Sequence, residues 1–164
     1  MKPAYLLAAI ILSFGTASNA WAACSDPAAP GVNWIGCDKT KATLSGATLT
    51  KAYLNNVDLF EANLNYAKMS GASLWKASLI YTTLVGADLK GANFIDADLR
   101  YATLTGADLS GADLTRVNLT NTNLSGATLT GADLSGATWI NSKICDEGSV
   151  GVCNSDGVAQ AVPD

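Results

Sequence analysis

A five-residue pattern repeats twenty times, without an insertion, between residues 42 and 141. The central residue of each unit is large and apolar: seventeen are leucine, and the others are Met69, Phe94 and Trp139. The residue two places before the centre is alanine in sixteen units and Val or Thr in the other four. This repeat comes before every other feature, because self-similarity at a fixed period decides the architecture of the whole chain.

A period of five residues fits neither an ordinary helix nor an unbroken strand. Five residues advance a helix by about 500°, so successive central residues would lie about 140° apart and cover every side of it. In a strand, side chains alternate, so an odd period would send successive leucines to opposite faces. The pattern becomes consistent if the chain bends once per unit, with the central residue and the residue two places earlier pointing inward. Nine units end in glycine, which favours such a bend.

Several units have a distinctive form, Ala-Asp-Leu followed by Ser or Thr and often by Gly. They occupy residues 107–111, 112–115 and 132–136. These units closely resemble those of the pentapeptide-repeat family, and the resemblance covers all twenty units. It implies an all-β fold, a right-handed quadrilateral β-helix with four units per coil and about five coils. Residues twenty apart would then lie above one another, and the Leu and Ala columns would form the core of a solenoid.

The β-helix is predicted over residues 42–141, and a solenoid needs caps over the core that its two ends expose. The chain on either side supplies an N-terminal cap, a C-terminal disulfide cap and a flexible tail, predicted at residues 23–41, 142–153 and 154–164. The spacing of the central residues continues into the caps at Trp34 and Ile144, but Lys39 interrupts it.

Residues 1–22 are predicted to be a signal peptide. Lys2 precedes an apolar stretch, and Ala20-Trp21-Ala22 is typical of a cleavage site. The apolar stretch is about half of the ~20 residues that a transmembrane helix needs, so no stable membrane insertion is expected. We therefore expect a periplasmic or secreted protein that is cleaved after Ala22.

All four cysteines lie in the predicted caps, Cys24 and Cys37 near one end and Cys145 and Cys153 near the other. An even number of cysteines in an exported chain favours disulfides. In the β-helix that the resemblance implies, five coils separate the two pairs by far more than the ~7 Å that a disulfide allows between Cα atoms. The expected disulfides are therefore Cys24–Cys37 and Cys145–Cys153, and a zinc site built from all four cysteines is excluded.

The sequence offers no catalytic site. It has no histidine, so neither a His-based triad nor a zinc-bound water can be assembled. Its glycines follow the five-residue repeat and not the spacing of a phosphate-binding loop. Asp96 and Asp98 look like paired acids, but Lys76 and Arg116 would lie below and above Asp96 in a column of alternating charge. We expect no enzyme activity, no cofactor and no metal.

The outward residues differ among the four sides of the expected β-helix, which we name after their first central residues as the Leu44, Leu49, Leu54 and Leu59 sides. The Leu44 and Leu49 sides carry mostly Ser, Thr, Asn and Gly. Large apolar residues gather on the Leu59 side and at the corner that leads into it: Phe60, Trp75, Ile80, Tyr81, Ile95 and Tyr101. Either intrachain stacking or an interaction surface explains this gathering.

These features favour a non-catalytic exported scaffold whose flat face binds a protein, either an unknown envelope protein or a second copy. The alternative is binding of an extended repetitive ligand, glycan or ice, to the ladder of Thr43, Asn63, Thr83, Thr103 and Asn123. Some members of the family resemble duplex DNA and bind DNA gyrase. That function is less favoured here, because the repeat region holds eight acids against six bases and follows an export signal. No nucleic-acid partner is expected, since no run of basic residues is present.

Overall fold

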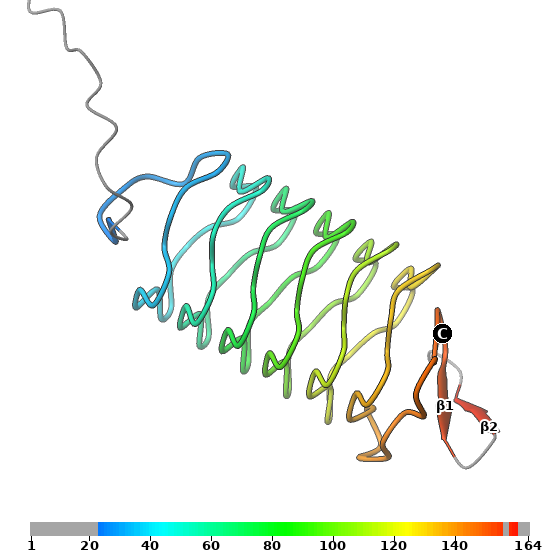
Figure 1. Cartoon of the computed structure of the whole chain (residues 1–164). Helices are drawn as coiled ribbons and strands as arrows, with labels where there is room; N and C mark the ends of the chain where they lie inside the picture. The colour runs from blue at the N-terminus through cyan, green and yellow to red at the C-terminus, as the bar shows by residue number, and fades with distance from the viewer. Residues whose placement is uncertain (1–22, 156–157, 161–164) are drawn as a thin grey trace, which may run out of the picture.

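A computed structural model describes residues 23–155 and 158–160 as a rod of stacked coils with a small β-hairpin at one end (Figure 1). The predicted signal peptide, residues 1–22, lies outside the described residues, as do residues 156–157 and 161–164 of the predicted tail. Within the described part of the chain, no helix is long and apolar enough to cross a membrane.

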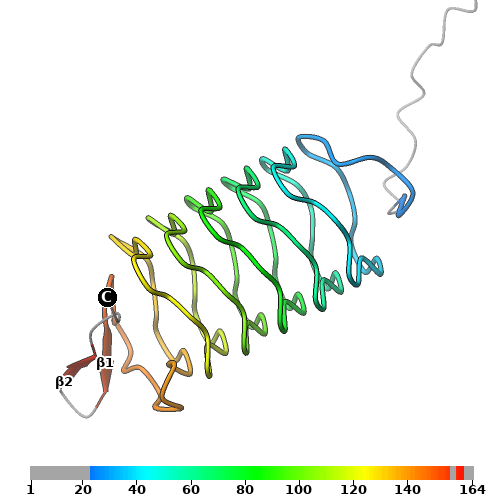
Figure 2. The same cartoon turned by 180° about the vertical axis from the view of Figure 1, so that it is seen from behind.

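Each coil of the rod has four short sides and a period of twenty residues. Parallel β-bridges join residues twenty apart, from Asn33 in the first coil to Thr138 in the last. The central residue of a unit donates its N–H to the next coil, as Leu84 does to the carbonyl of Thr103 at 2.7 Å. Each side contains only one bridged residue between two turns, so the coils form isolated β-bridges and not longer strands. Two opposite views show the coils stacked in one direction along the rod (Figures 1 and 2).

Each corner is a four-residue turn that begins at the central residue. The N–H three places later donates to the carbonyl of the centre, as Ala87 does to Leu84 at 3.1 Å. The third residue of the turn has a positive φ even where it is not glycine: Tyr66, Tyr81 and Tyr101 have values of 59°, 58° and 59°. This is the geometry of a type II turn. The left-handed region costs a residue other than glycine roughly 1–2 kcal/mol, a cost that the stacking of the coils offsets.

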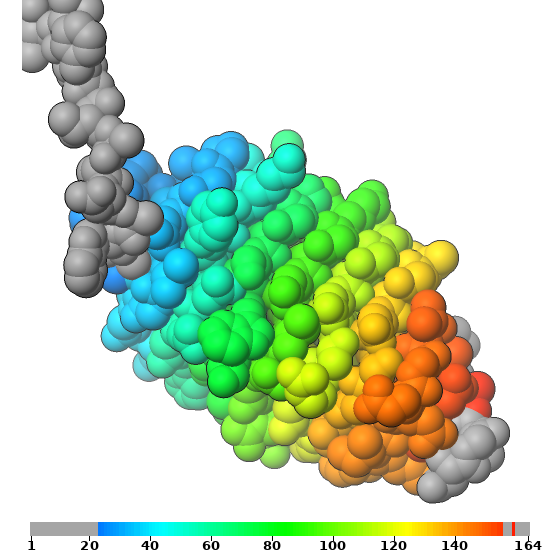
Figure 3. All heavy atoms as spheres, viewed as in Figure 1, coloured from blue at the N-terminus to red at the C-terminus, as the bar shows by residue number. Residues whose placement is uncertain are grey.

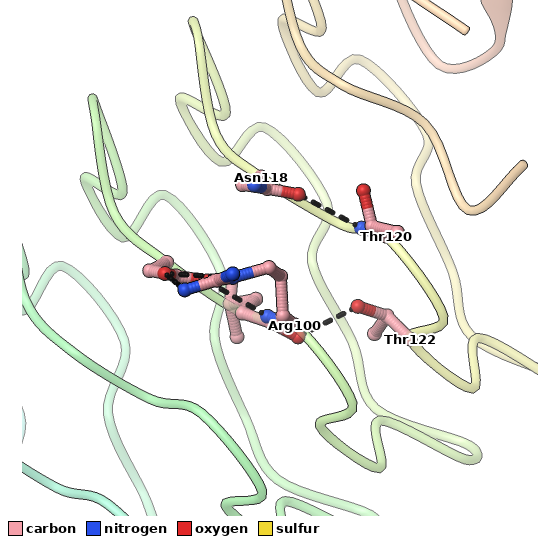
Figure 4. Close-up of polar contacts among 6 residues, drawn as sticks. Arg100, Asn118, Thr120 and Thr122 are labelled. Carbon is pink, nitrogen blue, oxygen red and sulfur yellow. Dashed lines mark hydrogen bonds and ion pairs between the residues drawn. The ribbon is translucent and has the colours of Figure 1, made fainter. Parts of the chain in front are cut away.

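The interior consists of the Leu and Ala columns that the sequence predicts. Every central residue from Leu49 to Trp139 is buried. Thr122 replaces Ala in one inward column, and its buried hydroxyl donates to the carbonyl of Leu99 at 2.7 Å (Figure 4). Thr82 makes the equivalent bond two coils earlier. Threonine is tolerated in this column because the bond satisfies a hydroxyl that would otherwise be buried without a partner.

The ladder begins earlier than the sequence analysis placed it. Asn33 and Asp38 already form parallel bridges, so two units within residues 23–41 belong to the β-helix itself. Trp34 is the buried central residue of the first unit, and its indole N–H donates to the carbonyl of Asp26 at 3.1 Å. The large indole supplies the apolar centre that this unit needs.

Lys39 takes the next central position, at the open end of the core. Its ammonium lies 3.9 Å from the centroid of the Trp34 ring and donates to the carbonyl of Cys24 at 2.6 Å. A lysine can cover apolar surface with its aliphatic stem while its charge stays at the edge, so the interruption does not break the fold. The Cys24–Cys37 disulfide, as predicted, ties the preceding segment to this coil.

The C-terminal cap turns back on the last coil. Thr138 and Asp133 form antiparallel bridges with Ile144 and Val150. Because the chain direction reverses, Ile144 does not continue the central column, although its spacing matches, and it is 58% exposed.

A β-hairpin follows this cap. Strands β1 (Cys153–Ser155) and β2 (Val158–Gln160) pair in antiparallel fashion. The first residue of β1 forms the predicted disulfide with Cys145. The segment predicted as a flexible tail, residues 154–164, therefore contains most of a paired hairpin.

Candidate interaction surface

The described residues contain neither a pocket nor a group of three or more His, Cys, Asp or Glu that could hold a metal ion. Leu, Ala and a few larger apolar side chains fill the interior of the rod. A site on this part of the chain is therefore built from outward side chains. The space-filling view shows these side chains in rows that follow the coils, without a deep hollow on the face in view (Figure 3).

Most carboxylates and amides just before a central residue have a structural role. Their side-chain oxygen accepts a hydrogen bond from the backbone N–H two residues later, as Asn118 does from Thr120 at 3.1 Å (Figure 4). Asp98 accepts from the Arg100 N–H in the same way and also binds its guanidinium at 2.7 Å. Such bonds stabilise turns. These acids therefore hold the corners of the coils in place.

The two acids that look paired in the sequence, Asp96 and Asp98, have different partners. Arg116 donates hydrogen bonds to both carboxylate oxygens of Asp96, at 2.7 and 3.0 Å, and these bonds hold the pKa of Asp96 below its usual range. Lys76 lies over the ring of Trp75 instead, with its ammonium 4.6 Å from the ring centroid. The predicted column of alternating charge thus forms a direct ion pair only between Asp96 and Arg116, while Lys76 helps to orient Trp75.

The lowered pKa of Asp108 predicts that the stability of the fold depends measurably on pH. Hydrogen bonds from Ser110, followed by the Lys90 ammonium 3.0 Å away, lower the pKa of Asp108 to about 2. A carboxyl with a lowered pKa stabilises the folded state above its unfolded pKa of about 3.9, and this stabilisation is lost as the pH falls toward the folded value. Asp108→Asn keeps the turn, because Asn118 makes the same bond, but it removes this titration.

The urea midpoints of the wild type and of Asp108→Asn should therefore differ at neutral pH and converge between about pH 4 and pH 2. Other carboxylates titrate in both proteins, so the difference between the two curves is the quantity to measure. Midpoints that stay parallel over this range would contradict a stabilising role for the Asp108 carboxylate.

The predicted apolar face is only partly exposed. Trp75, Tyr81 and Tyr101 are 38%, 51% and 45% exposed. Its other three members are half-buried: Phe60, Ile80 and Ile95. Phe60 packs edge-on against Tyr81, with ring centroids 5.9 Å apart, and this contact accounts for part of its burial. The exposed part of the face is therefore aromatic.

Tyr81 and Tyr101 form a stacked pair at the corner between the Leu59 and Leu44 sides. Their ring centroids lie 4.9 Å apart and their planes differ by 12°. They occupy the same turn position in successive coils, so the spacing between coils, about 4.8 Å, sets their separation. Intrachain stacking and an interaction surface, the two explanations for the apolar face, are therefore both compatible with this pair. The rings stack on each other within the chain, and each ring remains about half exposed.

Two strongly exposed tyrosines escaped the sequence analysis. Tyr66, at the corner that ends the Leu44 side, is 66% exposed, and Tyr53, on the Leu54 side, is 54% exposed. The Tyr66 ring lies over Gly86 of the next coil, where an added Cβ would be 2.9 Å from two ring carbons. The sequence did contain a signal for the position of Tyr66: a glycine, Gly86, follows it by twenty residues. A glycine at that place in the next coil leaves room for the tyrosine ring against the backbone.

The sequence model described as Pentapeptide repeats matches the chain in 8 copies. The matched residues are 31–59, 37–75, 58–96, 76–111 and 97–136, and together they span well over half of the chain. The chain belongs to the pentapeptide repeat family. Membership implies the right-handed quadrilateral β-helix, in agreement with the four-sided coils, and it indicates no enzyme family.

Solved structures of other pentapeptide repeat proteins resemble this chain. One from Nostoc Pcc 7120 is 40% identical, with 52% of this chain and 67% of that chain covered and a TM-score of 0.44. One from the cyanobacterium Cyanothece 51142 is 30% identical, with 58% and 85% covered and a TM-score of 0.27. One from the thylakoid lumen of Arabidopsis thaliana is 28% identical, with 76% and 81% covered and a TM-score of 0.30. The comparison with curated proteins gives no match.

Proposed function

We propose that this pentapeptide repeat protein is an exported, non-catalytic scaffold whose Leu59 side binds a protein partner, either another protein of the cell envelope or a second copy of the chain. The observation that carries the proposal is the exposure of Trp75, Tyr81 and Tyr101 along the two edges of this side. A stacked β-helix holds these side chains on a backbone that is hydrogen-bonded from coil to coil.

These side chains have the chemistry of interface hot spots. Trp, Tyr and Arg are the residues that most often dominate the binding energy of protein interfaces. Arg100 directly precedes Tyr101, and its guanidinium is held by Asp98 (Figure 4). The Trp75 ring is also held in place, because the Lys76 ammonium lies over it, 4.6 Å from the ring centroid. Side chains that are already ordered lose less conformational entropy on binding.

Export is supported by two features of the chain. Residues 1–22 have the pattern of a signal peptide. Both pairs of cysteines form disulfides, which persist in oxidising compartments such as the periplasm and the extracellular space.

Mimicry of DNA is disfavoured by the pairing of charges. Four of the eight acids of the repeat region form salt bridges with bases: Glu61 with Lys41, Asp96 with Arg116, Asp98 with Arg100 and Asp108 with Lys90. A surface that imitates duplex DNA needs rows of negative charge without such neutralising partners.

Trp75→Ala tests the proposal, with Tyr66→Asn as the matched control at the diagonally opposite corner of the rod. Trp75→Ala should weaken binding of a partner by about 2 kcal/mol or more. Its unfolding free energy should also fall, because at 38% exposure most of the indole is covered in the rod, so binding is compared under conditions in which both proteins are fully folded. Tyr66→Asn should leave binding of the protein partner unchanged.

The measurements are sedimentation equilibrium for self-association and, for another partner, affinity capture from envelope extracts followed by titration of the captured protein. Binding that is unchanged in Trp75→Ala, together with a large loss of stability, would show that Trp75 is a structural residue and would refute the proposal.

A further inference from the structure

The Leu44 side differs from the other three sides in its charge. Its outward positions, in the units from residue 42–46 to residue 122–126, contain no Asp, Glu, Lys or Arg. All fourteen charged residues of the repeat region lie on the Leu49, Leu54 and Leu59 sides. A ligand on the Leu44 side would therefore meet full charges only at the corner of Tyr81 and Tyr101, where Glu61 pairs with Lys41 and Arg100 pairs with Asp98.

The same side presents hydrogen-bonding groups in a regular ladder. Consecutive bridges connect Thr43, Asn63, Thr83, Thr103 and Asn123. The side-chain oxygens of Asn63 and Asn123 accept hydrogen bonds from the backbone N–H two residues later, which leaves their amide N–H groups as donors toward the outside. Among the described residues, the Thr103 hydroxyl has no hydrogen-bond partner and is both a donor and an acceptor.

Aromatic rings border this ladder on both edges. Tyr81 and Tyr101 form their stacked pair at the corner that leads into the Leu44 side. On the opposite corner, the Tyr66 ring lies over Gly86. Within the unit at residues 82–86, Thr83 therefore lies between the corner of Tyr81 and the ring of Tyr66.

We infer that the Leu44 side binds a neutral carbohydrate chain. Sugar hydroxyls need neighbouring donors and acceptors, which the Asn amides and Thr hydroxyls supply, and the C–H faces of sugar rings pack on aromatic rings such as those of the bordering tyrosines. An uncharged surface matches an uncharged ligand, because no ion has to be desolvated when the ligand binds. The ladder repeats about every 4.8 Å along the rod, so an extended chain can contact several coils at once.

This site is separate from the one proposed for a protein partner, although the corner of Tyr81 and Tyr101 borders both sides. Ice, the other repetitive ligand, is matched less well, since it fits a flat array of hydroxyls and this strip mixes Thr with Asn between bordering tyrosine rings. Tyr66 lies at the corner that ends the Leu44 side, and Trp75 lies at the diagonally opposite corner, which leads into the Leu59 side. Variants at these two positions therefore distinguish failure of one proposal from failure of the other.

The test is to screen the full mature protein against an array of neutral oligosaccharides, with anionic ones as controls, and to titrate the best binder by NMR. Tyr66→Asn should bind about tenfold more weakly, because it removes one stacking ring. Asn56 and Asn121 adopt the same positive φ, so the backbone accepts this change. Thr83→Tyr should abolish binding by filling the strip, and the fold tolerates it because Tyr53 occupies the equivalent position on another side.

Tyr53→Ala and Trp75→Ala should bind the sugar as the wild type does. Three outcomes would overturn the inference: no neutral oligosaccharide is bound, binding survives both Tyr66→Asn and Thr83→Tyr, or Thr83→Tyr instead abolishes thermal hysteresis in ice or capture of a protein.

Discussion

Leu89→Asp is expected to leave the protein unfolded or insoluble. Leu89 is fully buried in the middle of the rod, between Met69 and Leu109 of the same central column. An isolated carboxylate in such an apolar column has no ionic partner, and its desolvation costs more than the roughly 5–15 kcal/mol that separates a folded domain from its unfolded state. Protonation would avoid the charge, but it would leave a polar group buried without a hydrogen-bond partner.

Two control variants test whether burial of the charge is what prevents Leu89→Asp from folding. Thr128→Asp places the same charge outward on the same side, in the row that already contains Asp88 and Asp108, and should fold normally. Leu89→Ala should fold but lose about 2–5 kcal/mol of unfolding free energy, because it leaves a cavity. Circular dichroism and urea unfolding measure all three. A soluble Leu89→Asp protein that unfolds cooperatively would show that the central column is not buried.

The regular part of the fold was predictable because every five-residue unit has the same two inward residues to bury. A large apolar residue at the centre and a small one two places earlier can both be buried only if the chain bends every five residues. The ends do not repeat this demand. Trp34 and Ile144 share the same spacing, yet Trp34 is buried and Ile144 is exposed, since the chain continues in one direction at the first and reverses at the second. Spacing alone contains no information about that reversal.

The surface was predictable only in part, for a related reason. Sequence position tells which side chains point outward, and Trp75, Tyr81 and Tyr101 are indeed exposed. It does not tell how far neighbours in adjacent coils cover one another. Tyr81 packs against Phe60 and shields it, whereas the glycine above Tyr66 leaves that ring free on its outer face. The exposure of a side chain on a solenoid therefore depends on its neighbours in the adjacent coil, about twenty residues away, and differs from one position to the next.

Removal of the Cys145–Cys153 disulfide is expected to destabilise the C-terminal end of the rod. The link joins residues that are 8 apart in sequence, and both half-cystines are buried. Closing a loop of this size lowers the entropy of the unfolded chain enough to stabilise the protein by roughly 2–3 kcal/mol. The double variant Cys145→Ala with Cys153→Ala should lose about this much unfolding free energy in urea.

The site of the loss should be local. The cap supplies hydrogen bonds to the last coil, from the N–H of Leu134 to the carbonyl of Ser149 and from the N–H of Gly151 to the carbonyl of Ala132, each at 2.8 Å. Without the disulfide, the cap should open more often, and a solenoid loses structure from an unprotected end inward. Hydrogen exchange should therefore accelerate first at residues 132–139.

The double variant Cys24→Ala with Cys37→Ala is the matched control at the other end. It should accelerate exchange near Trp34 and leave residues 132–139 unchanged. Acceleration spread evenly over all coils in either variant would contradict the account of two independent caps, because it would mean that the rod opens only as a whole. Exchange that stays confined to the end from which the disulfide was removed would show that each link protects its own edge of the ladder.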